Sequence, residues 1–254
     1  MKKYLRSILF SVAILTAFCG MSVFAADRTV GLANNTWYSQ TEGPADMSYS
    51  DSTYFKIQVK KTGYLKVQGN GYYSDGSVSS LYFKFLNSKK KVINDSQGCS
   101  SYNKYTSHFA VKKGTYYVAV RGTGAYRIRY SFSSVSEKSG SKQKKAVKIK
   151  KGKTIKGLVL YGESNTKCDW YKIVLTKKQK LTFTFGARST GYIRFQIVPA
   201  SKKVRLYNAS GFLRDETNTY KTKDKLPKGT YYVKILKGAS AGKTDSGLYT
   251  IKWK

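Results

Sequence analysis

Histidine, cysteine, proline and the acidic residues are all scarce in this chain of 254 residues. The single histidine, His108, excludes the multi-histidine sites that usually hold transition metals. Gly238-Ala239-Ser240-Ala241-Gly242 matches the nucleophile-elbow pattern of hydrolases, but His108 precedes it, whereas that family needs the histidine after the serine. Nothing in the sequence brings Cys99 against His108 as a thiol nucleophile. The 13 acidic residues stand in no motif typical of paired catalytic carboxylates. We therefore expect no catalytic residue and no metal site, and we expect that the chain is not an enzyme.

The acidic residues are outnumbered by 47 lysines and arginines, which gives a formal net charge of +34. Such an excess concentrates polyanions near the protein, and salt weakens this attraction. Most of the basic residues are lysines, whose point charges favour diffuse attraction over the paired hydrogen bonds of arginine. An alternative interpretation is that the lysines keep a strand-rich protein soluble and protect its strand edges.

Residues 1–25 have the order of a secretory signal peptide: basic residues, an apolar run, and Val23-Phe24-Ala25 before the expected cleavage. We expect a secreted protein that is free or held noncovalently at a cell surface. The apolar run is short and interrupted by polar residues, so we expect no transmembrane segment in the mature chain. Export and the scarcity of arginine together predict against nucleic acid as a partner.

Two cysteines remain after removal of the signal, Cys99 and Cys168. A secreted protein can form a disulfide. The two residues do not occupy equivalent places in the repeat described next, so whether they pair stays open.

The sequence Lys-Gly-Thr-Tyr-Tyr-Val occurs twice, at residues 113–118 and 228–233. Other segments recur at similar offsets, as expected for two copies of one unit. We predict a first copy at residues 26–135, a linker at 136–144 and a second copy at 145–254. Each copy is long enough to bury its own core.

Apolar and polar residues alternate along both copies with the period of two that is typical of half-buried β-strands. Phe55, Ile57 and Val59, for example, alternate with polar residues. Turn residues such as Asn70-Gly71 recur at strand spacing, and no segment keeps a helical period. We predict an all-β chain of two tandem antiparallel jelly-roll-like β-sandwich domains after the signal peptide.

Each copy opens with an Asp-containing aromatic strand, at residues 51–55 and 169–171, and then has the Gly-Thr-Tyr-Tyr-Val strand. Each closes with a Tyr-x-Ile-x-Tyr or Tyr-x-Ile-x-Trp strand, at residues 126–130 and 249–253. This order resembles the bacterial pre-peptidase C-terminal domain, in two tandem copies. The resemblance implies a jelly-roll-like β-sandwich and a noncatalytic accessory role in binding polymers or in secretion.

Some collagen-binding modules related to that family hold calcium through acidic residues near the start of the domain. The first copy has Glu42, Asp46 and Asp51 there, whereas the second has only Glu163 and Asp169. We therefore expect no cofactor, and calcium stays an open alternative that the resemblance implies.

Tyrosine is abundant, with 22 residues. An exposed tyrosine offers a flat apolar face and a hydroxyl, which suit stacking on sugar rings. The alternative is that tyrosine simply covers sheet faces. Alternation predicts that Tyr116 and Tyr231 point into the core. The predicted binding residues are five tyrosines in polar loops, two outward tyrosines of the repeated strand and three lysines near the linker: Tyr72, Tyr73, Tyr102, Tyr105 and Tyr220; Tyr117 and Tyr232; Lys142, Lys144 and Lys145.

These features together favour a secreted noncatalytic protein that attaches to carbohydrate or anionic polymers of a cell envelope or matrix. Lysine-rich surfaces and exposed tyrosines would make the contacts, and two weak sites would act through avidity. The alternative is a protein-binding module whose partner is a collagen-like matrix or a secreted enzyme, including an enzyme that it inhibits.

Overall fold

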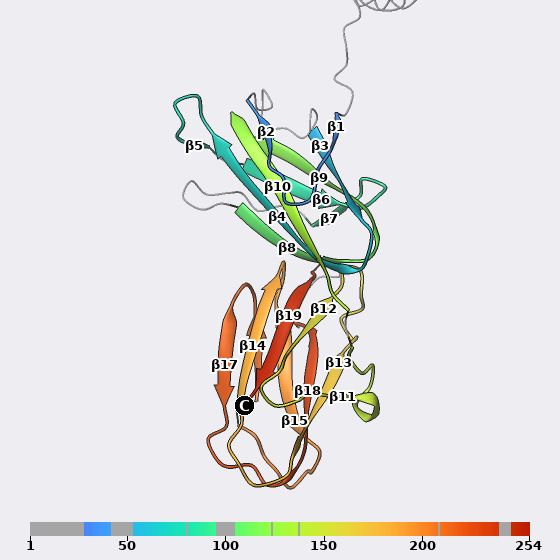
Figure 1. Ribbon diagram of the computed structural model, residues 1–254, viewed down its shortest axis with the longest axis vertical. Helices are drawn as coiled ribbons and strands as arrows, with labels where there is room; N and C mark the ends of the chain where they lie inside the picture. The colour runs from blue at the N-terminus through green and yellow to red at the C-terminus, as the bar shows by residue number, and fades with distance from the viewer. Residues whose placement is uncertain are drawn as a thin grey trace, which may run out of the picture.

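The computed structural model describes residues 28–41, 53–79, 81–94, 105–122, 124–136, 138–207, 209–238 and 245–254. Within these ranges the regular structure is β-strand apart from one 3-10 turn, η1 (Gln143–Lys145). The strands form four sheets, two in the first half of the chain and two in the second (Figure 1). The predicted all-β sandwich fold is therefore confirmed, whereas the signal peptide lies outside the described residues.

In the first half, one sheet has the strand order β1-β3-β9-β6-β7 and the other has the order β2-β10-β4-β5, with β8 also paired to β4. The strands of the first sheet are β1 (Thr29–Gly31), β3 (Thr53–Val59), β9 (Gly114–Gly122), β6 (Leu81–Leu86) and β7 (Val92–Asn94). Those of the second are β2 (Tyr38–Gln40), β10 (Ala125–Ser134), β4 (Gly63–Tyr72), β5 (Val78–Ser79) and β8 (Tyr105–Val111).

In the second half, the two orders are β11-β13-β18-β15-β16 and β12-β19-β14-β17. The first of these sheets contains β11 (Val147–Lys148), β13 (Asp169–Leu175), β18 (Gly229–Lys237), β15 (Ile193–Pro199) and β16 (Ser210–Leu213). The other contains β12 (Thr154–Val159), β19 (Gly247–Trp253), β14 (Thr182–Ser189) and β17 (Thr217–Lys221). No helix among the described residues is long and apolar enough to cross a membrane.

The two halves share one strand order. Each starts with a short strand that pairs in parallel with the next strand of its sheet: Val30 lies opposite Phe55 in the first half, and Val147 lies opposite Tyr171 in the second. β8 pairs with β4 as β17 pairs with β14. The sequence repeat is thus also a repeat of topology.

Each half encloses its own cluster of buried apolar side chains, which the alternating strands supply from inward positions. Side chains with no exposed surface include Phe55, Ile57, Val118 and Ile128 in the first core and Ile173, Phe183, Val233 and Ile251 in the second. The predicted register of the repeated strand is confirmed, because Tyr116 and Tyr231 are buried while Tyr117 and Tyr232 are partly exposed.

The segment before β11 is attached to the second half. Gly140 forms an antiparallel bridge with Trp170, and the Ser139 hydroxyl donates a hydrogen bond of 2.9 Å to Asp169 Oδ1. Ala146, which follows η1, is buried. Much of the stretch expected to act as a linker is therefore held by side-chain and backbone contacts.

The halves meet where β8 lies against β14 and β19 (Figure 1). The backbone of Ala110 contributes both of its polar groups to this junction. Its carbonyl accepts a hydrogen bond of 3.0 Å from the Tyr161 N–H, and its N–H donates one of 3.3 Å to Ser246 Oγ. The two sandwiches are thus joined through the edge strand β8.

Candidate functional site

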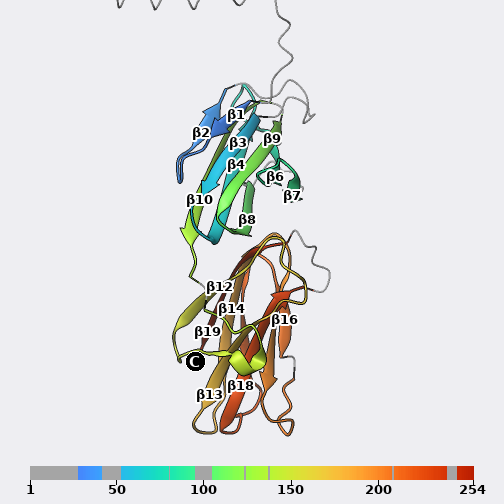
Figure 2. The ribbon, with the colours of Figure 1, turned by 90° about the vertical axis from the view of Figure 1, so that its right-hand side faces the viewer.

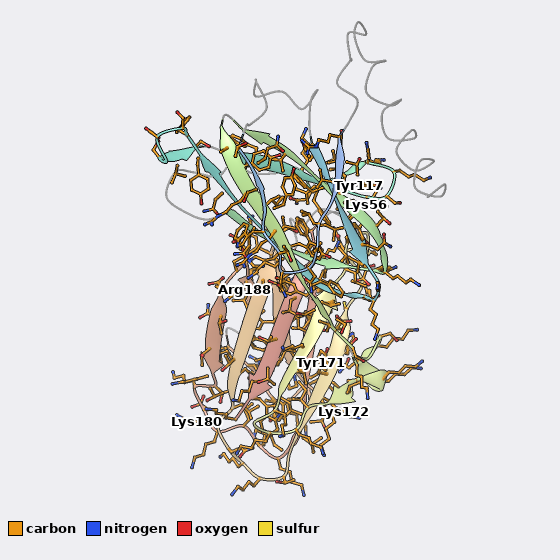
Figure 3. The ribbon with its side chains drawn as sticks, turned by 45° about the horizontal axis from the view of Figure 1, so that its top comes forward. Lys56, Tyr117, Tyr171, Lys172, Lys180 and Arg188 are labelled. Carbon is orange, nitrogen blue, oxygen red and sulfur yellow. The ribbon has the colours of Figure 1, made fainter. Side chains whose placement is uncertain are left out.

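Two tyrosines and a lysine lie together on the outer face of the sheet that contains β3 and β9. Tyr54 and Lys56 come from β3, and Tyr117 comes from β9. The rings of Tyr54 and Tyr117 meet edge to face at 6.5 Å and 87°, and Lys56 lies opposite Tyr117 across the strands. The Lys90 ammonium stands 3.9 Å from the centre of the Tyr54 ring. Figure 3 shows Lys56 beside Tyr117.

The second half repeats this arrangement on the face of β13 and β18. The rings of Trp170 and Tyr232 meet edge to face at 6.3 Å and 83°, and Lys172 lies opposite Tyr232. The Lys234 ammonium stands 5.6 Å from the centre of the Trp170 ring. We call Tyr54, Lys56 and Tyr117 the first ring–lysine site, and Trp170, Lys172 and Tyr232 the second.

The local strand geometry explains why these side chains share a face. Residues two apart on a strand point to the same side of the sheet, so Tyr54 and Lys56 emerge together, as do Trp170 and Lys172. An edge-to-face ring pair leaves an aromatic face open to a ligand, and a lysine beside it supplies a positive charge. Each site can therefore stack on a flat ring and attract an acidic group.

Two of the predicted binding residues, Tyr117 and Tyr232, belong to these sites. The other members of the sites are missed by sequence reasoning that looks for tyrosines in loops. Their signal is present in the sequence, because Tyr54 and Trp170 share the offset of 116 residues at which Phe55 aligns with Tyr171. A search for aromatic residues at outward strand positions in both copies would find them.

The expectation that Tyr72, Tyr105 and Tyr220 lie in loops is wrong. Tyr72 is the last residue of β4, Tyr105 is the first of β8, and Tyr220 lies within β17. Asn70-Gly71, a turn signal in the sequence, instead lies inside β4, because β10 pairs along the whole length of that strand. The pairing strand overrides the local turn preference.

The remaining predicted residues are spread over the molecule. Tyr73 is exposed in the turn after β4, where its N–H bonds the Ser77 carbonyl, and Tyr102 lies outside the described residues. The three lysines, Lys142, Lys144 and Lys145, are exposed at η1 of the second half. Tyr73 and the three lysines therefore belong to different halves of the chain.

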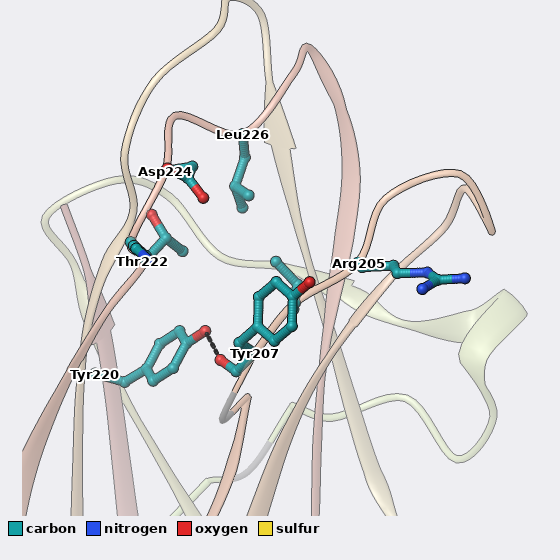
Figure 4. Close-up of a pocket in the computed structure, with 8 residues that line it drawn as sticks. Arg205, Tyr207, Tyr220, Thr222, Asp224 and Leu226 are labelled. Carbon is teal, nitrogen blue, oxygen red and sulfur yellow. Dashed lines mark hydrogen bonds between the residues drawn. The ribbon is translucent and has the colours of Figure 1, made fainter.

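Tyr220 lines a small pocket in the second half (Figure 4). Its hydroxyl donates a hydrogen bond of 2.8 Å to the Tyr207 carbonyl, and burial raises the pKa of Tyr220. The pocket offers about 40 Å³, which accommodates a few waters. Pockets that enclose small-molecule ligands are several times larger.

The acidic residues considered for calcium have other uses where they are described. Asp169 is buried and accepts a hydrogen bond of 2.9 Å from the Tyr249 hydroxyl, and Glu163 accepts one from the Leu160 N–H. No three potential metal ligands gather in the described ranges. Glu42, Asp46 and Asp51 fall outside those ranges.

The Cys168 thiol donates to the Thr166 carbonyl at 3.2 Å. Cys99 lies outside the described residues, and so does any disulfide between Cys99 and Cys168.

No protein-family model and no curated protein matches the chain. Solved structures with a similar fold include the pre-peptidase C-terminal domain of collagenase from Bacillus anthracis, with 12% identity and a TM-score of 0.29 over 47% of this chain and 100% of that one. Another is the tandem CBM51 modules of a family 98 glycoside hydrolase from Streptococcus pneumoniae, with 10% identity and a TM-score of 0.25 over 79% of this chain and 80% of that one. At these TM-scores the similarities assign neither a family nor a ligand.

Proposed function

We propose that this chain is a secreted noncatalytic binding protein that attaches to carbohydrate or anionic polymers through its two ring–lysine sites. The observation that carries the proposal is the repetition of one outward arrangement at equivalent places in both halves. Core packing does not require it, because the four aromatic rings and both lysines of the sites point away from the core.

The two sites lie in successive halves of one chain. Figure 2 shows the halves stacked along the long axis, with β7 of the first half and β16 of the second on the same side of the molecule. A polymer with repeated units can contact both sites, whereas a small ligand contacts one. Two weak contacts on one chain give an avidity that commonly exceeds either affinity by about 10² or more.

The lysines fit a polymer that carries negative charge. Lys56 is exposed and Lys172 is partly exposed, each beside a tyrosine ring that can stack on a sugar. The overall charge of +34 raises the local concentration of such a polymer. The diffuse charge supplies attraction, and the ring–lysine sites supply the short-range contacts.

The test is capture of the secreted chain on an insoluble anionic polysaccharide in four forms: wild type, K56Q, K172Q, and the double variant K56Q/K172Q. The matched control is K89Q/K151Q, which removes two exposed lysines, one from each half, that belong to neither site. We expect each single variant to lose about tenfold in apparent affinity through lost avidity, and the double variant to lose more. Equal losses in the double variant and in the control would contradict the proposal and favour diffuse charge alone.

A further inference from the structure

The opposite sheet of the first half carries a cluster of two arginines and two aromatic rings. The Arg127 and Arg129 guanidinium carbons lie 4.8 Å and 4.5 Å from the centre of the Trp37 ring, and Arg127 also lies 5.6 Å from the centre of the Tyr72 ring. All four side chains are partly exposed. We call Trp37, Tyr72, Arg127 and Arg129 the arginine–tryptophan cluster.

The positive charge of this cluster has no acidic counterpart in the described part of the chain. Arg129 Nε donates a hydrogen bond of 3.1 Å to the neutral amide of Gln68. The Arg127 side chain contacts both rings, and its Nε has no hydrogen-bond partner. Two guanidinium groups therefore lie against one indole ring, and no described residue places a carboxylate on them.

One part of the cluster is incompletely satisfied. Arg127 Nε and Asn70 Oδ1 are both buried without a hydrogen-bond partner, and these two residues lie opposite each other on β10 and β4. The Arg127 side chain as a whole is partly exposed. A buried polar group without a hydrogen-bond partner lowers the free energy of unfolding. Native proteins keep such groups where a ligand or a water molecule supplies the missing hydrogen bond.

The cluster belongs to the first half alone. At the register positions of the two arginines the second half has Thr250 and Lys252, and Thr154 lies opposite Lys252. Since the core residues of these strands are shared between the halves, the fold itself does not demand the arginines or the indole. Their presence in one copy points to a role that the other copy does not have.

We propose that the arginine–tryptophan cluster binds an acidic sugar, with the sugar carboxylate on the guanidinium groups of Arg127 and Arg129 and the ring against an aromatic face. Guanidinium matches the planar carboxylate through paired, charge-assisted hydrogen bonds, which lysine does not form. Aromatic rings at the same place suit the apolar face of a pyranose. The arginine–tryptophan cluster is then a third site, separate from the two ring–lysine sites.

The test is calorimetric titration of the full chain with tetragalacturonate, with the neutral galactose tetramer and inorganic phosphate as comparison ligands. We expect binding of tetragalacturonate and at least about tenfold weaker binding of both comparison ligands, because one lacks the charge and the other lacks the ring. Equal affinity for phosphate would overturn the assignment to an acidic sugar. Equal affinity for the neutral tetramer would overturn the role of the arginines.

Variants separate this site from the rest of the surface. We expect R127K and R129K each to lose about tenfold in affinity for tetragalacturonate. Lysine keeps the positive charge but cannot form the paired hydrogen bonds of a guanidinium group with a carboxylate. K252Q removes a charge at the equivalent place in the second half and should change little. Full binding by R127K, or an equal loss in K252Q, would overturn the proposal. K56Q/K172Q should keep this binding even if it loses capture on polymer, so the two proposals can fail independently.

Discussion

His108 Nε2 lies 3.8 Å from Asp215 Oδ1, across the junction between the two halves. On the other side of the ring, the Tyr64 hydroxyl lies 2.5 Å from His108 Nδ1, and the two rings stack at 5.8 Å. Burial raises the pKa of Tyr64 to about 12, so its hydroxyl keeps its proton and can donate to Nδ1. Burial also lowers the pKa of His108, with Asp215 opposing this effect and Arg188 and Lys66 adding to it.

Because the folded-state pKa of His108 is lowered from 6.5, the unfolded chain takes up the proton first as the pH falls. The contribution of the neutral imidazole to the free energy of unfolding is therefore full at pH values above about 6.5. It is lost progressively as the pH falls below that value. We expect the thermal midpoint of the wild type to fall as the pH drops below about 6.5, and to fall less in His108→Gln. Parallel pH profiles for the two proteins would show that other groups govern this range.

The repeated strand gives a contrast between neighbouring tyrosines. Tyr116 and Tyr231 are buried, and their hydroxyls donate to the Lys112 and Pro227 carbonyls at 3.0 Å and 2.9 Å. Replacing either with alanine should cost about 3–5 kcal/mol of unfolding free energy, because a large cavity remains in the core. The measurement is denaturant unfolding of each variant.

The outward neighbours provide the control for that experiment. Tyr117→Ala and Tyr232→Ala should change stability by about 1 kcal/mol or less, since both side chains are partly exposed. They should nevertheless weaken polymer capture, because both belong to ring–lysine sites. A larger stability loss from the outward pair than from the inward pair would contradict the binding assignment of this strand.

A buried carboxylate ties the segment before β11 to the second core. Asp169 accepts hydrogen bonds from Tyr249 and Ser139, and Tyr249 also shares a hydrogen bond of 2.8 Å with Tyr171. Tyr249→Phe removes the shared hydroxyl from beside a buried carboxylate and should cost about 1–3 kcal/mol. Tyr220→Phe, whose hydroxyl bonds an exposed carbonyl, is the control and should cost less in the same unfolding assay.

The contacts of Ser139 and Gly140 also predict where the second half begins as a folding unit. A chain that starts at residue 138 keeps the bridge to Trp170 and the bond to Asp169, whereas one that starts at residue 145 loses both. We expect both to unfold cooperatively and the longer one to have the higher thermal midpoint. Equal midpoints would show that the segment contributes nothing to stability.

Alternation and the internal repeat were sufficient to predict the all-β sandwich class and the inward residues. The alternating pattern around Tyr116 and Val118, for example, shows from local sequence alone that both point into the core. The site depended on more than local sequence. Asn70-Gly71 gives the local signal of a turn, and only the pairing of β4 with β10 extends the strand through it. Trp37 and Arg127 are 90 residues apart, so their contact follows from a sheet order that no short pattern encodes.

The junction at Ala110 has a consequence for the behaviour of the first half by itself. β8 pairs with β4 on one side, and the backbone groups of Ala110 on its other side are occupied by Tyr161 and Ser246 of the second half. An exposed strand edge is a template for pairing with another chain. The second half thus shields this edge from self-association, and an isolated first half should form soluble oligomers at concentrations where the intact chain stays monomeric.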